Sequence, residues 1–270
     1  MNGYSLRQNR KGFLSSLGLT TQLIIVNIFF FIVFSILIAF NGEFIKYIAL
    51  QPSAIANGQN LWTILTSIFM HAGIFHLFFN MFSLFFVGRF LEKLIGKKRF
   101  FWVYIISGLI GSLFFVLGGL IFGGPNVAGV GASGAIFGIL GVLAVLVPFS
   151  RIYLMAGPLI LIILDVLLAN FLPANVMAIV DVLINLLIIV MIFSILSFSS
   201  RLRKFAVPLE LPMWSLPIVA IVPLVVIGFF IPLPIGNSAH IGGLVAGLIY
   251  GFYLTRKYKN KTKLMRNHFR

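Results

Sequence analysis

The sequence predicts an all-α polytopic membrane protein, and three observations support this fold class. Of the 270 residues, 60% are hydrophobic and 9% are charged, and the mean hydropathy is +1.11. Soluble domains carry roughly 25% charged residues, so a water-soluble protein is excluded. About eight windows of roughly 20 mostly apolar residues occupy most of the chain, as membrane-spanning helices require. The basic residues lie at the ends of alternate windows, as orienting charges do.

The apolar windows give the expected order of the spans. The run from Leu23 to Phe40 is almost continuously apolar, whereas strands of a membrane β-barrel alternate in polarity. This first window follows basic residues, but it is too long for a typical signal peptide and lacks a small-residue cleavage pattern, so we expect a retained signal anchor. The windows begin near Gln22, Ile68, Phe100, Gly131, Gly157, Asn175, Pro212 and Ile235.

The basic residues predict the topology. If the N-terminus is cytoplasmic, every basic cluster lies on the cytoplasmic side and Lys46 alone lies outside. We therefore expect an even number of spans with both termini cytoplasmic. The net charge of +15 then reflects topology and contact with anionic headgroups rather than nucleic acid. The clusters are Arg7–Lys11, Arg89–Arg99, Arg151, Arg201–Lys204 and Arg256–Arg270.

The first candidate for chemistry is the sequence Gly131-Ala132-Ser133-Gly134, which opens the fourth expected helix. Glycines permit a tight turn into the helix, and a serine at a helix N-terminus lies beside unpaired N–H donors. Such donors can stabilise an oxyanion. Ser133 is therefore a candidate nucleophile, with a small-residue packing face formed by Gly134 and Gly138 as the alternative.

The second candidate is His240. Gly243, Gly247 and Gly251 follow it at offsets of 3, 7 and 11, which places all four residues on one helix face. The glycines allow close contact with a neighbouring helix, with the imidazole at that contact. His240 is a candidate base, or else a hydrogen-bonding residue of the helix interface.

The third candidate is the pair His76 and Asn80, which share a helix face at an i, i+4 offset. His71 lies five residues earlier and is expected about 140° around the same helix. A His/His/Asn metal site on this helix is therefore not expected. The chain has no cysteine, which excludes thiolate metal sites, Fe–S clusters and a thiol nucleophile, and we expect neither a metal nor a cofactor.

The fourth candidate is the acidic pair Asp165 and Asp181, each eight residues from Pro173 in the expected turn between the fifth and sixth spans. In an antiparallel hairpin the two carboxyl groups reach similar depth and could share a proton or bond to Asn185. A polar clasp that holds the hairpin together is the favoured interpretation. A transporter with a proton relay is the alternative, but the expected inverted repeats or broken helices are not found.

Topology connects the other three candidates. The second, fourth and eighth spans run in the same direction, and His76, Ser133 and His240 each lie near the start of their span. Charge bias alone therefore places all three side chains at one depth, toward the outer face.

These residues resemble the rhomboid family of intramembrane serine proteases. The family's G-x-S-G motif is matched by Gly131–Gly134, its H-x-x-x-N by His76 and Asn80, and its later histidine in a glycine-rich helix by His240. The resemblance covers roughly residues 60–150 and 208–255. Further matching positions are Leu61-Trp62, Phe69-Met70-His71, Gly88, Glu92, Gly96 and Phe137.

Two features depart from the family. Trp62 is followed by Thr63, where the family often has an arginine, so the hydrogen bonds of that arginine must be replaced or absent. Residues from Arg151 to about Val207 add two spans where rhomboids commonly have a short connection. The resemblance thus implies a six-helix core with an inserted hairpin at about 151–207, within one membrane domain of residues 1–270 that ends in a basic tail at about 256–270.

The resemblance implies a Ser–His dyad, with Ser133 as nucleophile and His240 as general base. Asn80, His76 and the Ser133 N–H would form the oxyanion site, and neither Glu43 nor Glu92 is placed to orient His240. The expected substrates are single-span membrane proteins cleaved near the outer face, in what we expect to be a prokaryotic plasma membrane. The alternative is a catalytically inactive, derlin-type protein that binds membrane clients. The sequence does not define the oligomeric state.

Overall fold

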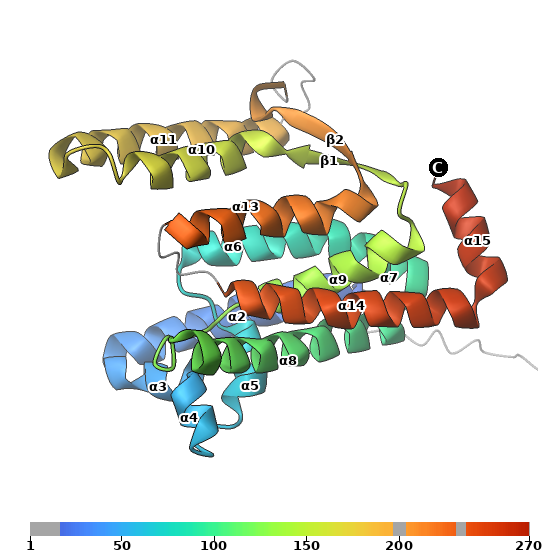
Figure 1. The fold of residues 1–270 in the computed structure, drawn as a ribbon, viewed down its shortest axis with the longest axis horizontal. Coiled ribbons are helices and arrows are strands. Elements are labelled where there is room, and N and C mark those ends of the chain that lie inside the picture. The colour runs from blue at the N-terminus through green and yellow to red at the C-terminus, as the bar shows by residue number, and fades with distance from the viewer. Residues whose placement is uncertain (1–16, 197–203, 231–235, 270) are drawn as a thin grey trace, which may run out of the picture. The chain divides into compact units, whose positions relative to one another are not determined.

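The computed structural model describes residues 17–196, 204–230 and 236–269 (Figure 1). The predicted all-α fold class is confirmed. Within the described part of the chain, five helices are long and apolar enough to cross a membrane, and three shorter apolar helices accompany them. The number of spans and the side on which the termini lie stay predictions. The long helices are Leu19–Phe40, Ile74–Ile95, Lys97–Phe122, Ala174–Ser194 and Asn237–Lys257, and the shorter ones are Ser133–Leu146, Ala156–Asp165 and Met213–Pro223.

Several sequence expectations fall outside the described residues. These are the basic cluster Arg7–Lys11, residues 201–203 of the cluster Arg201–Lys204, Arg270, and Ile235, near which the eighth window begins.

The chain forms two compact units. The first contains residues up to Pro148 together with Trp214–His268, and the second contains Phe149–Met213. The helices of the first unit are α2 (Leu19–Phe40), the short α3 (Ile45–Ile48), α4 (Pro52–Ala56) and α5 (Thr63–Thr66), then α6 (Ile74–Ser83), α7 (Arg89–Ile95), α8 (Lys97–Phe122), α9 (Ser133–Leu146), α13 (Leu216–Phe230), α14 (Asn237–Lys257) and α15 (Lys259–His268).

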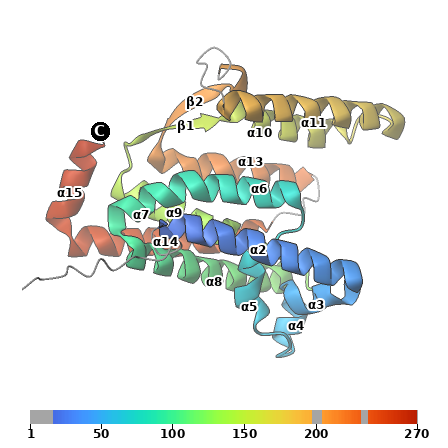
Figure 2. The same cartoon turned by 180° about the vertical axis from the view of Figure 1, so that it is seen from behind.

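The second expected span begins later than predicted. The window was placed near Ile68, but residues Ser67–Phe69 form a 3₁₀ turn and the helix begins at Ile74. Gly73 interrupts the helical geometry, because its φ of −179° and ψ of 174° are fully extended. From Ile74 the helix continues through a π-helical segment, Leu84–Gly88, into α7. Figure 2 shows α2 running beside this helix.

The centre of the first unit is the contact of α8, α9 and α14 (Figure 1). Glycines permit this contact: a Cβ on Gly243 would lie 1.9 Å from the carbonyl oxygen of Gly134, and one on Gly247 would lie 2.0 Å from that of Gly138. Gly111 of α8 also meets Gly134, with 3.3 Å from its ideal Cβ position to the Gly134 Cα. The predicted glycine packing face is therefore present, and these backbones approach too closely for any side chain.

The second unit is a helical hairpin with a small β-ribbon. Its helices are α10 (Ala156–Leu168) and α11 (Ala174–Leu196), and a 3₁₀ turn covers Lys204–Ala206. The strands β1 (Arg151–Met155) and β2 (Pro208–Pro212) pair antiparallel, with Arg151 opposite Pro212 and Met155 opposite Pro208. Arg151 Nη1 forms an ion pair with Glu210 Oε1 at 3.2 Å. The helical patterns did not predict this ribbon.

Candidate active site

Ser133 is the first residue of α9. The first N–H groups of an α-helix have no intrahelical acceptor, so the serine hydroxyl lies beside free donors. The preceding turn depends on Gly131, whose φ of 126° is a conformation that other residues rarely adopt. The Gly131 N–H donates to the carbonyl of Ser67 at 2.9 Å, which fixes the entry of the chain into α9.

His240 lies one turn into α14 and meets the serine directly. Its Nε2 is 2.9 Å from Ser133 Oγ, a hydrogen-bond distance. The two residues are 107 positions apart in the chain, and they meet because Gly134 and Gly243 let α9 and α14 come into backbone contact. His240 is 7% exposed, whereas Ser133 is half-buried, so the hydroxyl is the more accessible member of the pair.

The His240 ring is oriented by an aromatic side chain. Phe137, one turn after Ser133, stacks on the imidazole with a centroid separation of 4.4 Å and an interplanar angle of 23°. The remaining ring nitrogen, Nδ1, is buried and has no hydrogen-bond partner among the described residues. Among the described residues, the imidazole of His240 thus stacks on Phe137 and has no third polar residue bonded to Nδ1.

His76 and Asn80 of α6 approach the same turn. A Cβ on Gly131 would lie 2.8 Å from His76 Nε2 and 3.9 Å from Asn80 Nδ2, so both side chains face the space that Gly131 leaves open. The Ala72 N–H donates to His76 Nδ1 at 3.4 Å, which leaves the proton of the neutral ring on Nε2. Asn80 Nδ2 donates to the His76 carbonyl at 2.9 Å, and its second hydrogen remains for another acceptor.

The expected position of His71 was wrong. Because the helix begins only at Ile74, His71 precedes it, and the helical angle separating it from His76 does not apply. Its ring instead lies 5.2 Å from that of His76 at an interplanar angle of 67°. His71 is buried, and neither ring nitrogen has a partner among the described residues. The sequence signal that could have placed it is Ala72-Gly73, a weak helix start.

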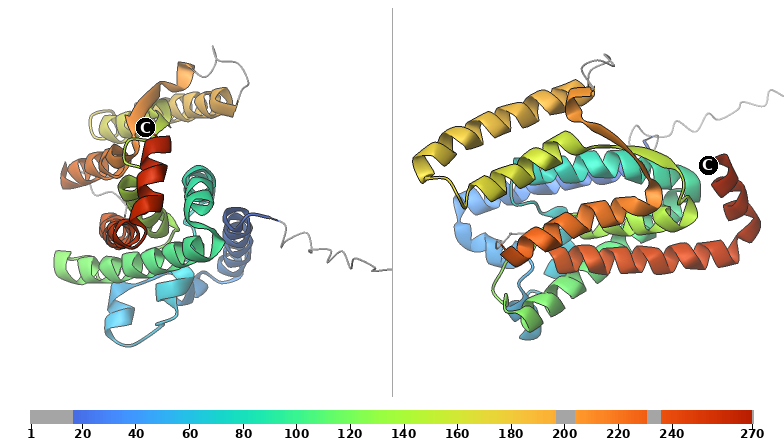
Figure 3. Two further views of the ribbon diagram at one scale, coloured as in Figure 1. Left: turned by 90° about the vertical axis from the view of Figure 1, so that its right-hand side faces the viewer. Right: turned by 45° about the horizontal axis from the view of Figure 1, so that its top comes forward.

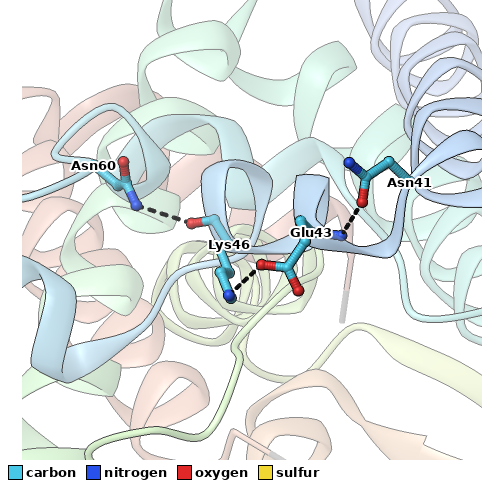
Figure 4. Close-up of polar contacts among 4 residues, drawn as sticks. All are labelled: Asn41, Glu43, Lys46 and Asn60. Atoms are coloured by element: carbon cyan, nitrogen blue, oxygen red, sulfur yellow. Dashed lines mark hydrogen bonds and ion pairs between the residues drawn. The ribbon is translucent and has the colours of Figure 1, made fainter.

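Thr63 lies in the segment between α2 and α6, which is held by several hydrogen bonds. Trp62 Nε1 donates to the Tyr47 carbonyl at 2.8 Å, Thr63 Oγ1 donates to the Asn60 carbonyl at 2.7 Å, and Asn60 Nδ2 donates to the Lys46 carbonyl at 2.9 Å. Figure 4 shows the Asn60 bond beside the ion pair of Lys46 with Glu43. The hydrogen bond from this exposed lysine to the Glu43 carboxylate raises the pKa of Lys46. The loop forms these hydrogen bonds with a threonine at the position where the family often has an arginine.

The two glutamates of the first unit have other partners. Glu43 pairs with Lys46. Glu92 of α7 accepts from the backbone N–H groups of Leu19 and Thr20 at 2.7 and 2.8 Å and from the Thr20 hydroxyl at 2.7 Å. It thereby satisfies the free N–H donors at the start of α2, far along the helices from His240.

The acidic pair lies in the second unit. The carboxyl groups of Asp165 on α10 and Asp181 on α11 lie close enough across the hairpin to interact electrostatically, although Asp165 Oδ1 has no hydrogen-bond partner among the described residues. Asn185 Nδ2 donates to the Asp181 backbone carbonyl at 2.8 Å, a bond within α11. The proximity of the two acids is compatible with a clasp, which stays a prediction.

Fold and site together define a polytopic membrane protein with a Ser–His pair at the start of two glycine-packed helices. The rhomboid domain family matches residues 58–191 and 182–257, and the chain belongs to this family. Membership supports an intramembrane protease-like function at the level of the family.

Curated relatives include active and inactive proteins. The chain is 42% identical over 97 residues to the putative rhomboid protease YdcA of Bacillus subtilis, covering 36% of this chain and 46% of that protein. It is 42% identical over 95 residues to the rhomboid protease GluP of the same organism, covering 35% and 17%. The inactive RHOMBOID-like protein 8 of Arabidopsis thaliana is 39% identical over 92 residues, covering 34% and 25%. The alignments thus span less than half of each of these relatives.

Proposed function

We propose that this protein is an intramembrane serine endopeptidase that cleaves transmembrane segments of membrane proteins near the outer face. The observation that carries the proposal is the 2.9 Å distance between His240 Nε2 and Ser133 Oγ. A serine hydroxyl is a weak nucleophile unless a neighbouring base accepts its proton. If Ser133 and His240 served only to pack α9 against α14, their side chains would not need to be hydrogen-bonded to each other.

In the proposed reaction, Ser133 Oγ attacks the scissile carbonyl carbon while His240 Nε2 takes the hydroxyl proton. The neutral ring must carry its own proton on Nδ1 beforehand. When the tetrahedral intermediate collapses, the peptide C–N bond breaks and His240 returns the proton to the leaving amine. Water then attacks the acyl-enzyme, again with His240 as base, and regenerates the Ser133 hydroxyl.

The proposed oxyanion site combines three donors. The Ser133 N–H belongs to the first turn of α9, His76 carries its proton on Nε2, and Asn80 has one amide hydrogen uncommitted. Donors aimed at the developing negative charge are worth about 2.7–4 kcal/mol of barrier each. Gly131 supports this assignment, since it leaves open the space that His76 and Asn80 face.

The proposed substrates are single-span membrane proteins. An intact helix hides its carbonyls in i→i−4 hydrogen bonds, so the segment must unwind before Ser133 can reach one. Cleavage sites should therefore contain glycine, proline or other residues that weaken a helix. We further propose that the protein resides in a prokaryotic plasma membrane, and that the second unit is a hairpin inserted into a single membrane domain.

The second candidate is a catalytically inactive, derlin-type protein that binds membrane clients. The existence of an inactive relative in Arabidopsis thaliana gives it weight. The presence of both Ser133 and His240 at hydrogen-bond distance favours the protease.

The test is cleavage of a reporter transmembrane segment by purified protein in liposomes. Ser133→Ala removes only the hydroxyl, so we expect cleavage to be abolished. Ser107→Ala is the matched control: Ser107 is a buried serine of α8 outside the pair, and its variant should retain cleavage. Retained cleavage in Ser133→Ala would refute the mechanism.

A labelling experiment separates the two candidates without a known substrate. A fluorophosphonate reacts with an activated serine, so it should label the wild-type protein and Ser107→Ala but neither Ser133→Ala nor His240→Ala. A folded wild-type protein that resists labelling would favour the client-binding protein.

A further inference from the structure

A second site lies at the opposite ends of the core helices. A pocket of about 110 Å³ is formed where α8 begins and where α9 and α14 end. Its apolar wall includes Ile95, Leu146 and Leu254, and its polar wall includes Arg99, Tyr258 and Lys261. No acidic side chain lines it. The pocket is thus apolar on one side and cationic on the other.

The position of the pocket matches a membrane boundary. His240 and Lys257 are seventeen residues apart on α14, which is about 25 Å along a helix. The hydrocarbon core of a bilayer is about 30 Å thick. A dyad near the outer face therefore places the pocket at the level of the inner headgroups, on the side where the basic clusters are expected.

The cations around the pocket are not neutralised by carboxylates. Arg99 donates from Nη2 to the Tyr258 hydroxyl at 2.9 Å, and its guanidinium lies 4.8 Å from the centre of that ring. Lys257 Nζ lies 5.9 Å from the same ring. Lys257 also donates to the Tyr253 hydroxyl at 2.7 Å. Arg99 and Lys261 line the pocket together with Tyr258, and no carboxylate is present among the described residues that line it.

The wall formed by α15 is held in place by the core. Arg266 of α15 donates from Nη2 to the Val145 carbonyl in the last turn of α9, at 2.8 Å. Thr262 is buried and donates to the Tyr258 carbonyl at 3.1 Å. Figure 3 shows α15 turning away from the axis of α14. The pocket is therefore built from fixed elements.

We propose that this pocket binds the phosphate headgroup of an anionic phospholipid, a role separate from peptide cleavage. Arg99 and Lys261 contact the phosphate oxygens, since arginine and lysine donate charge-assisted hydrogen bonds to phosphate. The apolar lining residues that are only half-buried, Leu94 and Met265, meet the first part of the acyl chains. Basic pockets between membrane helices on the cytoplasmic side bind lipid headgroups in this way. A free phosphate ion would leave the apolar wall unused.

The test measures lipid binding by the purified full-length chain in neutral detergent. Phosphatidylglycerol is added, with phosphatidylcholine as the neutral lipid and glycerol 3-phosphate as the soluble anion. Bound lipid is counted by native mass spectrometry, and the thermal unfolding midpoint is measured in parallel. We expect phosphatidylglycerol alone to be retained and to raise the midpoint. Equal stabilisation by glycerol 3-phosphate would overturn the lipid assignment.

Variants localise the binding. Arg99→Gln and Lys261→Gln should each weaken phosphatidylglycerol binding about fivefold, the effect of losing one basic residue near an anionic lipid. Lys98→Gln and Lys263→Gln remove the same charge from α8 and α15 but do not line the pocket, and should bind as the wild type does. Lys261→Gln also leaves the Arg99–Tyr258 contact intact, so it tests binding even if Arg99→Gln does not fold. Equal weakening in the control variants would overturn the proposal, because it would indicate diffuse attraction.

Discussion

The two units of the chain hold their helices together in different ways. In the first, α9 and α14 meet backbone to backbone, and a Cβ on Gly243 would lie 1.9 Å from a carbonyl oxygen. In the second, α10 and α11 pack with an acidic pair, Asp165 and Asp181, between them, and much of α11 is exposed, including Val182 and Phe193. Backbone-to-backbone contact is thus found where Ser133 and His240 lie 2.9 Å apart.

The largest expected difference in cleavage rate is between variants of two asparagines that make the same hydrogen bond within their helices. Asn80 and Asn185 each donate to the carbonyl four residues earlier, at 2.9 and 2.8 Å. Asn80→Ala should lower kcat about 100- to 1,000-fold, because it removes an oxyanion donor. Asn185→Ala should cleave the reporter at a rate within about twofold of the wild type. Equal losses in the two variants would mean that Asn80 acts through the helix rather than on the substrate.

A second comparison uses glycines in the two units. Gly243→Ala forces α14 away from Gly134, and we expect about a 100-fold loss of cleavage from the displaced dyad, with destabilisation of about 1–3 kcal/mol. In Gly157→Ala of the hairpin, the new Cβ would lie 2.7 Å from the flexible Met191 Sδ and 3.0 Å from a backbone oxygen. This variant should lower the unfolding midpoint less than Gly243→Ala does and should preserve cleavage. Gly42→Ala is the control, since nothing lies within 4 Å of the Gly42 Cβ position. It should change neither cleavage nor the unfolding midpoint.

The smallest expected effect concerns the acidic pair. Asp165→Asn combined with Asp181→Asn replaces the two carboxyl groups with amides of nearly the same size and removes their titratable groups. Reporter cleavage should stay within about twofold of the wild type. Complete loss of cleavage in folded protein would indicate that the carboxyl groups belong to the catalytic site. The two units would then no longer differ in their importance for cleavage.

The parts of the site that follow from spacing were predictable from sequence. Helix periodicity placed His240 on the same helix face as Gly243, and it placed His76 on the same face as Asn80. The distribution of basic residues predicted that both histidines lie at the depth of Ser133. Contacts that depend on loop conformation were not predictable. The extended Gly73 shifted the start of α6 and brought His71 beside His76, and the Trp62–Tyr47 bond joins residues whose approach no periodic pattern encodes. The β-ribbon likewise depends on pairing across more than 50 residues, which local propensity does not specify.

The contact of Gly111 with Gly134 has a consequence for hydration. Gly111 lies eleven residues before the end of α8 at Phe122, so Ser133 is recessed by about 16 Å from that end of the helix. The fourteen-residue α9 is only about 21 Å long, too short to fill a bilayer of about 30 Å. In the proposed protease, water for deacylation would have to reach this recessed level. A substrate would have to bring its scissile bond down to the same level, so we expect cleavage several residues inside the hydrophobic segment rather than at its edge.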